Sequence, residues 1–446
     1  MTAEAQHDEH GSEGFTLKDL QDAWPVLARD DRAQGFSMLP RHEAEEFFLH
    51  LPSRDVAELV LLLPATDRRS WMRLLPPDDA ADVLQHAPKS EREALHELLD
   101  DFTKKEVTGL LRYAEDQAGG LMNPRFALIR PTMTVDEALS YVHKQARENV
   151  ESLYYVYVVD EEQHLIGVIS LRDLLAARPE KTVRDIMKTE VVAVDEHADQ
   201  EKVARVFAQH DLMAIPVVDP ERHIKGIVTV DDIVDVVQQE ATEDAQKFGG
   251  MESLDEPYLE IEFWKMARKR GGWLAALFLG EMLTATAMAF FEEEIARAVV
   301  LALFVPLIIS SGGNSGSQAS TLVIRAMAVG EVRLRDWWRV MRRELASGLA
   351  LGSLLGTIGF LRIVVWQAVS PLYGPHYLLV AGTVFLSLIG VVTFGTLAGS
   401  LLPFVLRRVG FDPASASAPF VATLVDVTGL VIYFSVAAVL LSGTLL

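Results

Sequence analysis

Long apolar stretches dominate the second half of the chain. They run approximately over residues 272–291, 298–326, 344–369, 377–405 and 414–441. Each stretch is long enough to cross about 30 Å of hydrocarbon as an α-helix. The pattern therefore predicts a transmembrane domain over residues 271–446 that contains five helices.

The charged residues that flank these stretches predict their orientation. Arg and Lys gather before the first stretch, between the second and third, and between the fourth and fifth. The other two connections hold Glu292–Glu294 with only Arg297, or SPLYGPHY (370–377) with no Lys or Arg. Positive residues mark the cytoplasmic side of a membrane protein. We therefore expect a multi-pass protein of the cell (inner) membrane, with its N-terminus in the cytoplasm and its C-terminus outside.

The formal net charge of −22 is unevenly distributed. The first 265 residues carry 54 acidic and 28 basic side chains, whereas the remainder carries 9 acidic and 13 basic ones. Such an acidic soluble half argues against nucleic acid as a partner. The chain has no cysteine, which excludes disulfides and thiolate metal sites.

A short repeat occupies the N-terminal region. Leu-Pro or Ala-Pro pairs begin at residues 39, 51, 63, 75 and 87, a spacing of twelve. Proline suits the first turn of a helix, and the acidic residues that follow complement the helix dipole. The pattern predicts an acidic, all-α helical-repeat domain over residues 1–118. Its surface is either regulatory or a plain scaffold, and the pattern does not decide between them.

A longer repeat follows. The segment 158–175 matches 217–234 at an offset of 59 residues, and 122–138 pairs with 187–203. Each unit predicts a strand, a helix, two strands joined by a turn, and a second helix. The pair resembles tandem CBS domains, α/β modules that often bind adenosine nucleotides, over residues 119–180 and 181–239.

That resemblance implies a ribose-binding pattern, Ser or Thr followed three residues later by Asp. It is present as Ser170 with Asp173 and as Thr229 with Asp232, and Arg172 is the phosphate partner it suggests. ATP or a related nucleotide is thus one expectation for these modules, and a purely structural role is the other.

An acidic connecting helix is expected between the repeats and the membrane domain, over residues 240–270. QQEATEDAQKF (238–248) predicts a helix on which Glu240, Glu243 and Asp244 share one face. Such a face is either solvated or a site for a divalent cation, since hard cations take oxygen ligands. The nearby carboxylates Asp231, Asp232 and Asp235 favour the cation.

Polar residues also lie inside the predicted membrane spans. SSGGNSGSQAS (310–320) occurs within the second stretch and either packs closely against another helix or lines a wet cavity. We favour the cavity because so many polar groups cluster there.

Asp426 lies within the fifth stretch, where a charge costs about 2.5–3.5 kcal/mol on insertion scales. It is either a hydrogen-bonded structural residue or, as we favour, a carboxylate on a cation pathway. Glu281 in the first stretch poses the same question and receives less weight because other small polar residues surround it.

Several motifs accompany this order of segments: YAEDQAGGLMNP (113–124), YYVYVVDEE (154–162), EATEDAQKFG (240–249), SGGNSGSQASTLVIRA (311–326) and PFVATLVDVTGLVIYFSVA (419–437). Together they resemble the MgtE family of bacterial magnesium channels over nearly the whole chain. The resemblance implies a homodimer whose single pore is lined mainly by the second and fifth membrane helices. Asp426 from each subunit would hold a hydrated Mg²⁺ ion, with the backbone carbonyl of Ala422 as an accessory ligand.

The resemblance also implies a gate that cytosolic Mg²⁺ closes and that ATP modulates. Bound cations would neutralise acidic surfaces, draw the dimer together and close the pore through the connecting helix. Carried over by motif, the sensing carboxylates are Glu201, Asp211, Asp232, Asp235, Glu240, Glu243, Asp244 and Asp412.

One departure and two alternatives remain. Ala418 stands where family members can place a polar Asn near the cytoplasmic mouth of the pore.

A transporter of Co²⁺, Mn²⁺ or Zn²⁺ is one alternative, which the lack of cysteine and of histidine in the membrane core disfavours. A non-transporting membrane sensor is the other. Hydrolytic motifs such as HExxH and G-x-S-x-G are absent, so we expect no enzyme.

Overall fold

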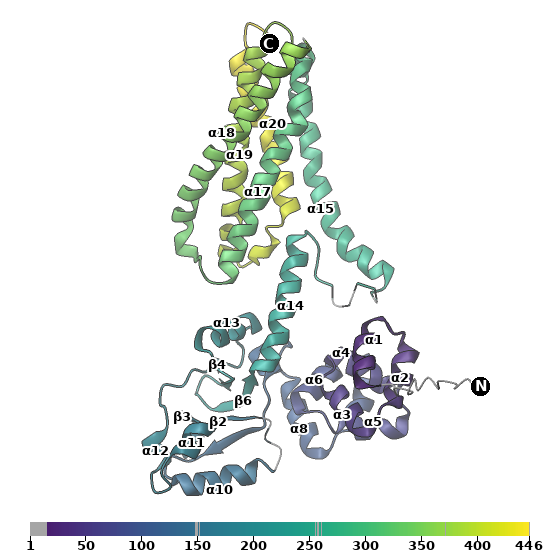
Figure 1. Cartoon of the computed structure of the whole chain (residues 1–446), viewed down its shortest axis with the longest axis vertical. Helices are drawn as coiled ribbons and strands as arrows, with labels where there is room; N and C mark the ends of the chain where they lie inside the picture. The colour runs from purple at the N-terminus through teal and green to yellow at the C-terminus, as the bar shows by residue number, and fades with distance from the viewer. Residues whose placement is uncertain are drawn as a thin grey trace, which may run out of the picture. The chain divides into compact units, whose positions relative to one another are not determined.

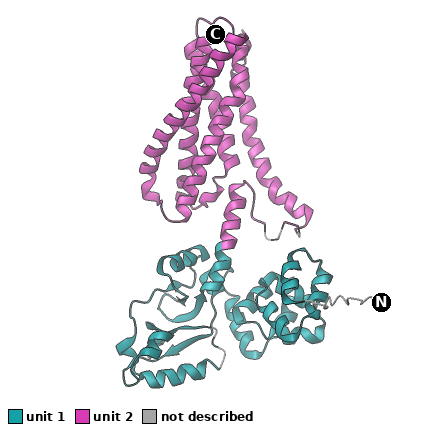
Figure 2. Cartoon of the chain, viewed as in Figure 1, with its two compact units in different colours: residues 1–237 teal, residues 238–446 magenta. Residues whose placement is uncertain are grey.

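The computed structural model describes residues 16–147, 150, 152–254, 256, 258–259, 261–370 and 372–445. The first fifteen residues of the predicted helical-repeat domain lie outside this part of the chain. The chain divides into two compact units, Met1–Val237 and Gln238–Leu446 (Figure 2). Each unit is described by itself.

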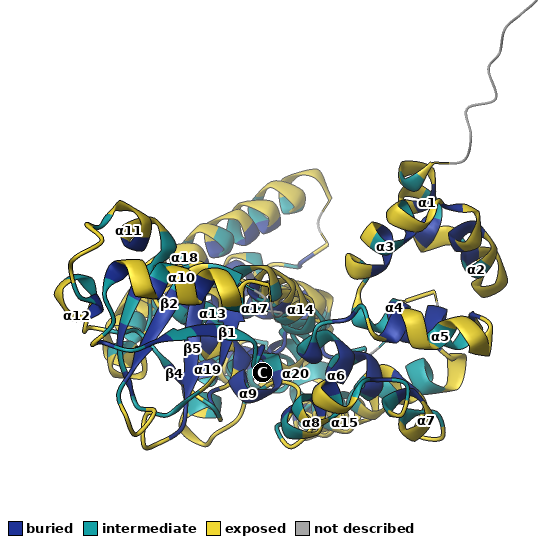
Figure 3. Cartoon of the chain, turned by 90° about the horizontal axis from the view of Figure 1, so that it is seen from below, coloured by how far each residue is buried: buried dark blue, intermediate teal, exposed yellow. Residues whose placement is uncertain are grey.

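Short helices form the N-terminal part of the first unit. They are α1 (Leu17–Ala23), η1 (Trp24–Val26), α2 (Arg29–Met38), α3 (Arg41–Leu49), α4 (Ser53–Leu62), α5 (Ala65–Met72), α6 (Pro77–His86), α7 (Arg92–His96) and α8 (Asp101–Leu110). The repeated proline lies at the N-cap, one residue before the helix, at Pro40, Pro52, Pro64 and Pro76. Each helix buries one face and exposes the other (Figure 3). The all-α prediction is confirmed, with proline outside the first turn rather than in it.

Two similar α/β subdomains complete the first unit. The first contains β1 (Phe126–Ile129), α10 (Val135–Gln145), β2 (Ser152–Val159), β3 (Leu165–Ser170) and α11 (Leu171–Ala176). The second contains β4 (Val194–Asp195), α13 (Gln200–His210), β5 (Ala214–Val218), β6 (Ile224–Thr229) and the start of α14 (Val230–Phe248). The short helices α9 (Ala118–Leu121) and α12 (Val183–Ile186) precede β1 and β4. This is the predicted order of elements.

The two sheets share one topology and one register. In each, the first strand is parallel to the second, and the second is antiparallel to the third. Val158 pairs with Gly167 in the first sheet, and Val217 pairs with Gly226 in the second. Gly226 is required by space, since an added Cβ would lie 2.9 Å from the backbone carbonyl oxygen of Asn123, and a Cβ at Gly167 would displace the Met187 side chain, whose Sδ would lie 2.7 Å away. The sequence repeat is therefore a structural repeat.

Long helices make up the second unit (Figure 1). The five that are long and apolar enough to cross a membrane contain α15 (Phe263–Phe290), α17 (Val305–Ala328), α18 (Trp337–Val369), α19 (Tyr377–Arg408) and α20 (Ala418–Leu441). Shorter elements connect them: α16 (Glu292–Arg297), η2 (Val299–Phe304), η3 (Leu334–Asp336) and η4 (Pro413–Ser415). The five predicted spans and the overall fold class are confirmed.

Two boundaries differ from the pattern. α15 and α18 begin well before the apolar stretches that predicted them. The pattern missed these starts because the first turns carry Lys and Arg, which lower the local hydropathy. The predicted helix over 238–248 is the C-terminal part of the longer α14, which ends at Phe248. The connecting helix expected over 240–270 is therefore not continuous, because the next helix, α15, begins only at Phe263.

Glycines allow α19 to pack closely against its neighbours. Four glycines of α18 face it, and a Cβ at Gly352 would lie 2.7 Å from the Cα of Ile389. On α17, a Cβ at Gly316 would lie 2.9 Å from the carbonyl oxygen of Gly395. Small residues let membrane helices approach at backbone distance. α17, α18 and α19 therefore form a tight layer in the single chain.

Candidate functional site

The polar stretch of α17 has two different faces. Gly312 and Gly316 are buried against α19 and α20, where an added Cβ would collide with Val391, Val425 or Val421. Ser310, Asn314 and Gln318, spaced by four residues, are exposed in the single chain. One face of the stretch therefore packs closely, as the first interpretation expects, and the other face is exposed in the single chain, so the cavity interpretation stays a prediction.

α20 lies beside this stretch of α17. The Ser317 hydroxyl donates to the carbonyl of Ala418 (3.3 Å), and the Ser320 hydroxyl donates to the carbonyl of Ala416 (2.8 Å). One turn further along, Ala422 packs on Gly313, with 3.6 Å between its Cβ and the position of a Gly313 Cβ. These contacts hold the start of α20 against α17. The helix itself begins there because the Ser417 side chain caps it and Pro419 occupies its first turn.

Asp426 is half-buried on α20, one turn beyond Ala422 and on the same face. The helix α15 reaches this face: a Cβ at Gly280 would lie 2.9 Å from Thr423 Cγ2. The next residue of α15, Glu281, places its carboxyl beside that of Asp426. The structure thus brings together two acidic residues that the sequence ranked unequally, and the signal for Glu281 was its position inside an apolar stretch.

A second acidic group gathers at one end of the same unit. Lys247 of α14 lies between two carboxylates, donating to Asp412 Oδ2 at 2.7 Å and pairing with Glu243. Burial lowers the pKa of Lys247, but the hydrogen bonds to Asp412 and Glu243 outweigh it and leave the pKa raised. Two predicted sensing residues, Glu243 and Asp412, are thus brought together and are bridged by a fixed positive charge. Glu240 and Asp244 are half-buried on the same helix.

A third acidic group lies in the first unit. Asp232 accepts a hydrogen bond from the Thr229 hydroxyl (2.7 Å), and it contributes to raising the pKa of Asp82 on α6. Burial is the main cause of that raised pKa, followed by Glu115, Asp79 and Asp232. The sequence did not single out Asp82, Asp79 or Glu115. The available signal was the run of acidic residues after Pro76 and Pro77.

The other predicted sensing residues of the first unit are exposed. Asp235 lies on the solvent side of α14. Glu201 starts α13 and accepts from Arg205 at 2.9 Å, whereas Asp211 ends the same helix in a left-handed conformation (φ 51°). A helix rises about 1.5 Å per residue, so Glu201 and Asp211 are about 15 Å apart and do not share a site within one chain.

The two Ser/Thr–Asp patterns adopt different geometries. Ser170 caps α11, its Oγ accepting from the backbone N–H of Asp173 (3.0 Å), and this leaves the side chains of Arg172 and Asp173 exposed. In the second pattern the Asp232 carboxylate already accepts from Thr229 and takes part in the acidic group around Asp82. Asp173 is therefore the more accessible of the two predicted ribose partners.

Comparison with known families agrees with this arrangement. The model of MgtE, a divalent cation transporter, matches residues 305–436. That of the MgtE intracellular N domain matches residues 16–116, and the CBS domain model matches 118–180 and 183–239.

Individual relatives match over most of their length. The magnesium transporter MgtE of Thermus thermophilus is 45% identical over 369 residues, which are 81% of this chain and 79% of that protein. The magnesium transporter MgtE of Enterococcus faecalis is 37% identical over 333 residues, 75% of this chain and 71% of that protein. Among solved structures, the cytosolic domain of the Mg²⁺ channel MgtE in complex with ATP is 43% identical, with a TM-score of 0.46, and covers 49% of this chain and 90% of that one.

The predicted resemblance is therefore confirmed. The chain is a multi-pass membrane protein with an intracellular N-terminal domain and tandem CBS domains, and the relatives that match over three quarters or more of it are magnesium transporters. It belongs to the MgtE family of magnesium transporters.

Proposed function

We propose that this transporter is a homodimeric channel for Mg²⁺ uptake, whose pore passes the Asp426 carboxylates and closes when cytosolic Mg²⁺ binds its acidic groups. Mg²⁺ is the transported substrate of the family rather than a resident cofactor. The observation that carries the proposal is the exposed polar stripe Ser310, Asn314 and Gln318 on α17 in the unit that holds Asp426.

The polar stripe supports the homodimer. Polar side chains in the middle of a membrane span are costly against lipid and normally face protein or a water-filled cavity. No described residue of the single chain covers Asn314 or Gln318. A second copy related by a two-fold axis would bring the same stripe to face the first, and the closed lining would hold water.

The two carboxyls near the pore support cation transport. Asp426 and Glu281 lie side by side, and two acidic groups inside a membrane repel each other unless a proton or a cation lies between them. Mg²⁺ dehydrates reluctantly and prefers octahedral oxygen coordination. We assign Asp426 of both copies to a hydrated Mg²⁺, with the Ala422 carbonyl as an accessory ligand and Glu281 as a second source of negative charge.

The acidic groups outside the membrane support the gate. They comprise Glu201, Asp211, Asp232, Asp235, Glu240, Glu243, Asp244 and Asp412 from the motif, to which we add Asp82, Asp79 and Glu115. Lys247 supplies a positive charge between Glu243 and Asp412 that Mg²⁺ could replace. Closure requires that Mg²⁺ bind the closed state more tightly than the open one. Many weak carboxylate sites acting together would meet that requirement.

ATP is a modulator in this proposal. Ser170, Arg172 and Asp173 are accessible at the start of α11, where Asp173 would accept from ribose hydroxyls and Arg172 would pair with phosphate. Thr229 and Asp232 would form the corresponding nucleotide contact in the second CBS domain. Asp232 would link that contact to the acidic group around Asp82.

The membrane topology belongs to the same proposal. The basic connections favour a C-terminus outside the cell (inner) membrane. We propose domains over residues 1–118, 119–180, 181–239, 240–270 and 271–446. Ala418 opens α20 next to Ser317, so the cytoplasmic mouth carries a backbone carbonyl where a side-chain amide can stand in the family.

A single cysteine tests the pore, because the natural chain has none. Asn314→Cys should support Mg²⁺ entry into liposomes loaded with a fluorescent indicator, and a cationic cysteine-reactive reagent should then block that entry. Oxidation should also cross-link the chain to a dimer. Leu354→Cys is the matched control, since Leu354 is exposed on α18, away from the stripe. Block and cross-linking at position 354 but not at 314 would contradict the proposal.

A further inference from the structure

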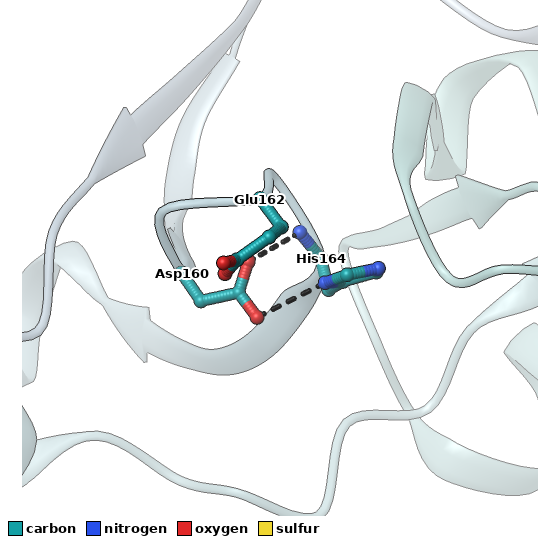
Figure 4. A group of neighbouring side chains, drawn as sticks. All are labelled: Asp160, Glu162 and His164. Carbon is teal, nitrogen blue, oxygen red and sulfur yellow. Dashed lines mark hydrogen bonds and ion pairs between the residues drawn. The ribbon is translucent and has the colours of Figure 1, made fainter.

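Two groups of metal-ligating side chains lie outside the acidic groups described above. They occupy equivalent turns of the α/β repeat: Asp160, Glu162 and His164 between β2 and β3, and Asp219, Glu221 and His223 between β5 and β6. In each group, one ligand atom from each residue lies within 4.8 Å of the others. Figure 4 shows the first group, in which the Asp160 and Glu162 carboxylates lie close together beside His164.

A carboxylate orients each imidazole. Asp160 Oδ2 lies 3.0 Å from His164 Nδ1, and Asp160 Oδ1 accepts from the His164 backbone N–H at 2.8 Å (Figure 4). Asp219 holds His223 in the same way, with 3.0 Å from Oδ2 to Nδ1 and 2.8 Å to the backbone N–H. A neutral imidazole whose Nδ1–H is donated to a carboxylate presents Nε2 as an acceptor. This carboxylate–histidine pairing is typical of histidines that bind metals.

The two turns meet at the histidines. The His164 and His223 rings are stacked, with 4.5 Å between their centroids and 24° between their planes. The backbones also pair there, because the Leu165 N–H donates to the Arg222 carbonyl at 2.9 Å. The side chains of His164 and His223 remain 38% and 34% exposed. Both imidazoles are therefore partly accessible to solvent at the point where the two turns meet.

The two groups differ in their charge balance. Lys225 Nζ lies 3.0 Å from Asp219 Oδ2, so the second group is partly neutralised. The equivalent position in the first group is Ile166, which carries no charge. The first turn therefore supplies most of the negative charge, and the second supplies mainly its imidazole.

Imidazole ligands separate this site from the Mg²⁺ groups. Mg²⁺ takes oxygen ligands, whereas imidazole suits Zn²⁺, Cu²⁺ and Ni²⁺. We propose that the paired turns bind one transition-metal ion of the Zn²⁺ class. His164 and His223 are the principal ligands through Nε2, and Asp160 and Asp219 orient the imidazoles. An ion held by both turns would tie the two α/β subdomains together.

Metal binding to the full-length protein in detergent tests the site. After chelator treatment, the protein is titrated with Zn²⁺ by calorimetry in millimolar Mg²⁺, and with Co²⁺ as an optical probe. The intact chain should bind one Zn²⁺ that Mg²⁺ does not displace. The double variant His164→Ala/His223→Ala should lose this binding, and Asp160→Asn should weaken it about 10–100-fold.

The matched control is His143→Ala/His210→Ala, which removes two exposed histidines from α10 and α13. It should bind Zn²⁺ as the intact chain does. His164→Gln/His223→Gln repeats the test with side chains that preserve hydrogen bonding, in case the alanine variant does not fold. An intact chain that takes up no Zn²⁺ in excess Mg²⁺, or a Gln variant that keeps the full Zn²⁺ stoichiometry, would overturn the proposal.

Discussion

Polar residues lie in opposite environments on α17 and α19. On α19, Thr383, Thr396 and Ser400 are buried, and their hydroxyls donate to backbone carbonyls within the chain. On α17, Asn314 and Gln318 are exposed. A hydroxyl that bonds its own helix can be buried inside one chain, whereas an amide left uncovered in a membrane span requires water or a partner. The difference indicates that the single chain is complete around α19 and incomplete along α17.

The largest effect is expected where α17 and α19 touch. A Cβ at Gly399 would overlap the carbonyl of Gly316, which is backbone and cannot rotate away. Gly399→Ala should therefore lower the free energy of unfolding by about 3 kcal/mol, as overpacking does. Gly382→Ala on the same helix has nothing within 4 Å and should be neutral or slightly stabilising. Thermal unfolding in detergent measures the stability of both variants. Equal stabilities would contradict the close backbone contact between α17 and α19.

The comparison itself can be tested by exchanging polar for apolar side chains on each helix. Asn314→Leu should reduce Mg²⁺ flux about tenfold or more while leaving the unfolding temperature unchanged, because the proposed pore has this exposed amide in its lining and the chain gives it only a long hydrogen bond, 3.5 Å to Ser310 Oγ. Thr383→Val should do the reverse, lowering the free energy of unfolding by about 1 kcal/mol with flux retained. If flux falls for Thr383→Val and not for Asn314→Leu, the proposal has assigned the pore lining to the wrong helix.

The gate should respond to the charge between Glu243 and Asp412. Lys247→Met removes the ammonium that now bridges these carboxylates, so Mg²⁺ meets no competitor there. We expect cytosolic Mg²⁺ to close the channel at a concentration roughly five-fold lower than in the intact protein. Lys104→Met, which breaks a surface pair with Glu97, is the control and should leave the response unchanged. Closure at a higher concentration would mean that Lys247 supports the Mg²⁺ site.

A smaller effect is expected at Asp82. Its pKa is raised well above the ordinary 3.8 by burial and by Glu115, Asp79 and Asp232, so the folded state holds its proton more tightly than the unfolded state. In Mg²⁺-free buffer its contribution to stability is therefore full below pH 3.8 and is lost as pH rises through the raised value. Asp82→Asn should flatten this dependence, as measured by denaturant unfolding at several pH values. An unchanged slope would exclude Asp82 as the titrating group.

The sequence predicted the spans well but not the starts of two of them. Apolar length alone identifies a helix that crosses lipid, and this located all five. α15 and α18 continue into basic turns outside the hydrocarbon, where hydropathy carries no signal. The start of α14 was missed for a related reason, because the acidic pattern after Gln238 hid its continuity with the helix after β6.

The sequence could predict a site residue that is unusual in its own local stretch. It could not predict a site residue whose importance depends on a contact between distant parts of the chain. Asp426 is conspicuous because a carboxylate inside an apolar stretch is costly. Glu281 could be weighted properly only once α15 was known to pack against α20. Asp82 and Asp232 are 150 residues apart in the chain, and only the fold of the first unit brings them together. Even the histidine pair, whose spacing follows the repeat, needed the structure to show that its two turns meet.

The most direct test of the account is Mg²⁺ entry through Asp426. Liposomes loaded with a fluorescent indicator receive the intact protein, Asp426→Ala or Asp426→Asn, with the cytoplasmic face kept free of Mg²⁺ and empty vesicles as the baseline. Thr428→Ala, two residues away on α20, is the matched control. The account predicts rapid entry with the intact and Thr428→Ala proteins and entry at the baseline for both Asp426 variants. Undiminished flux through folded Asp426→Ala protein would contradict the assignment of that carboxylate to the pore.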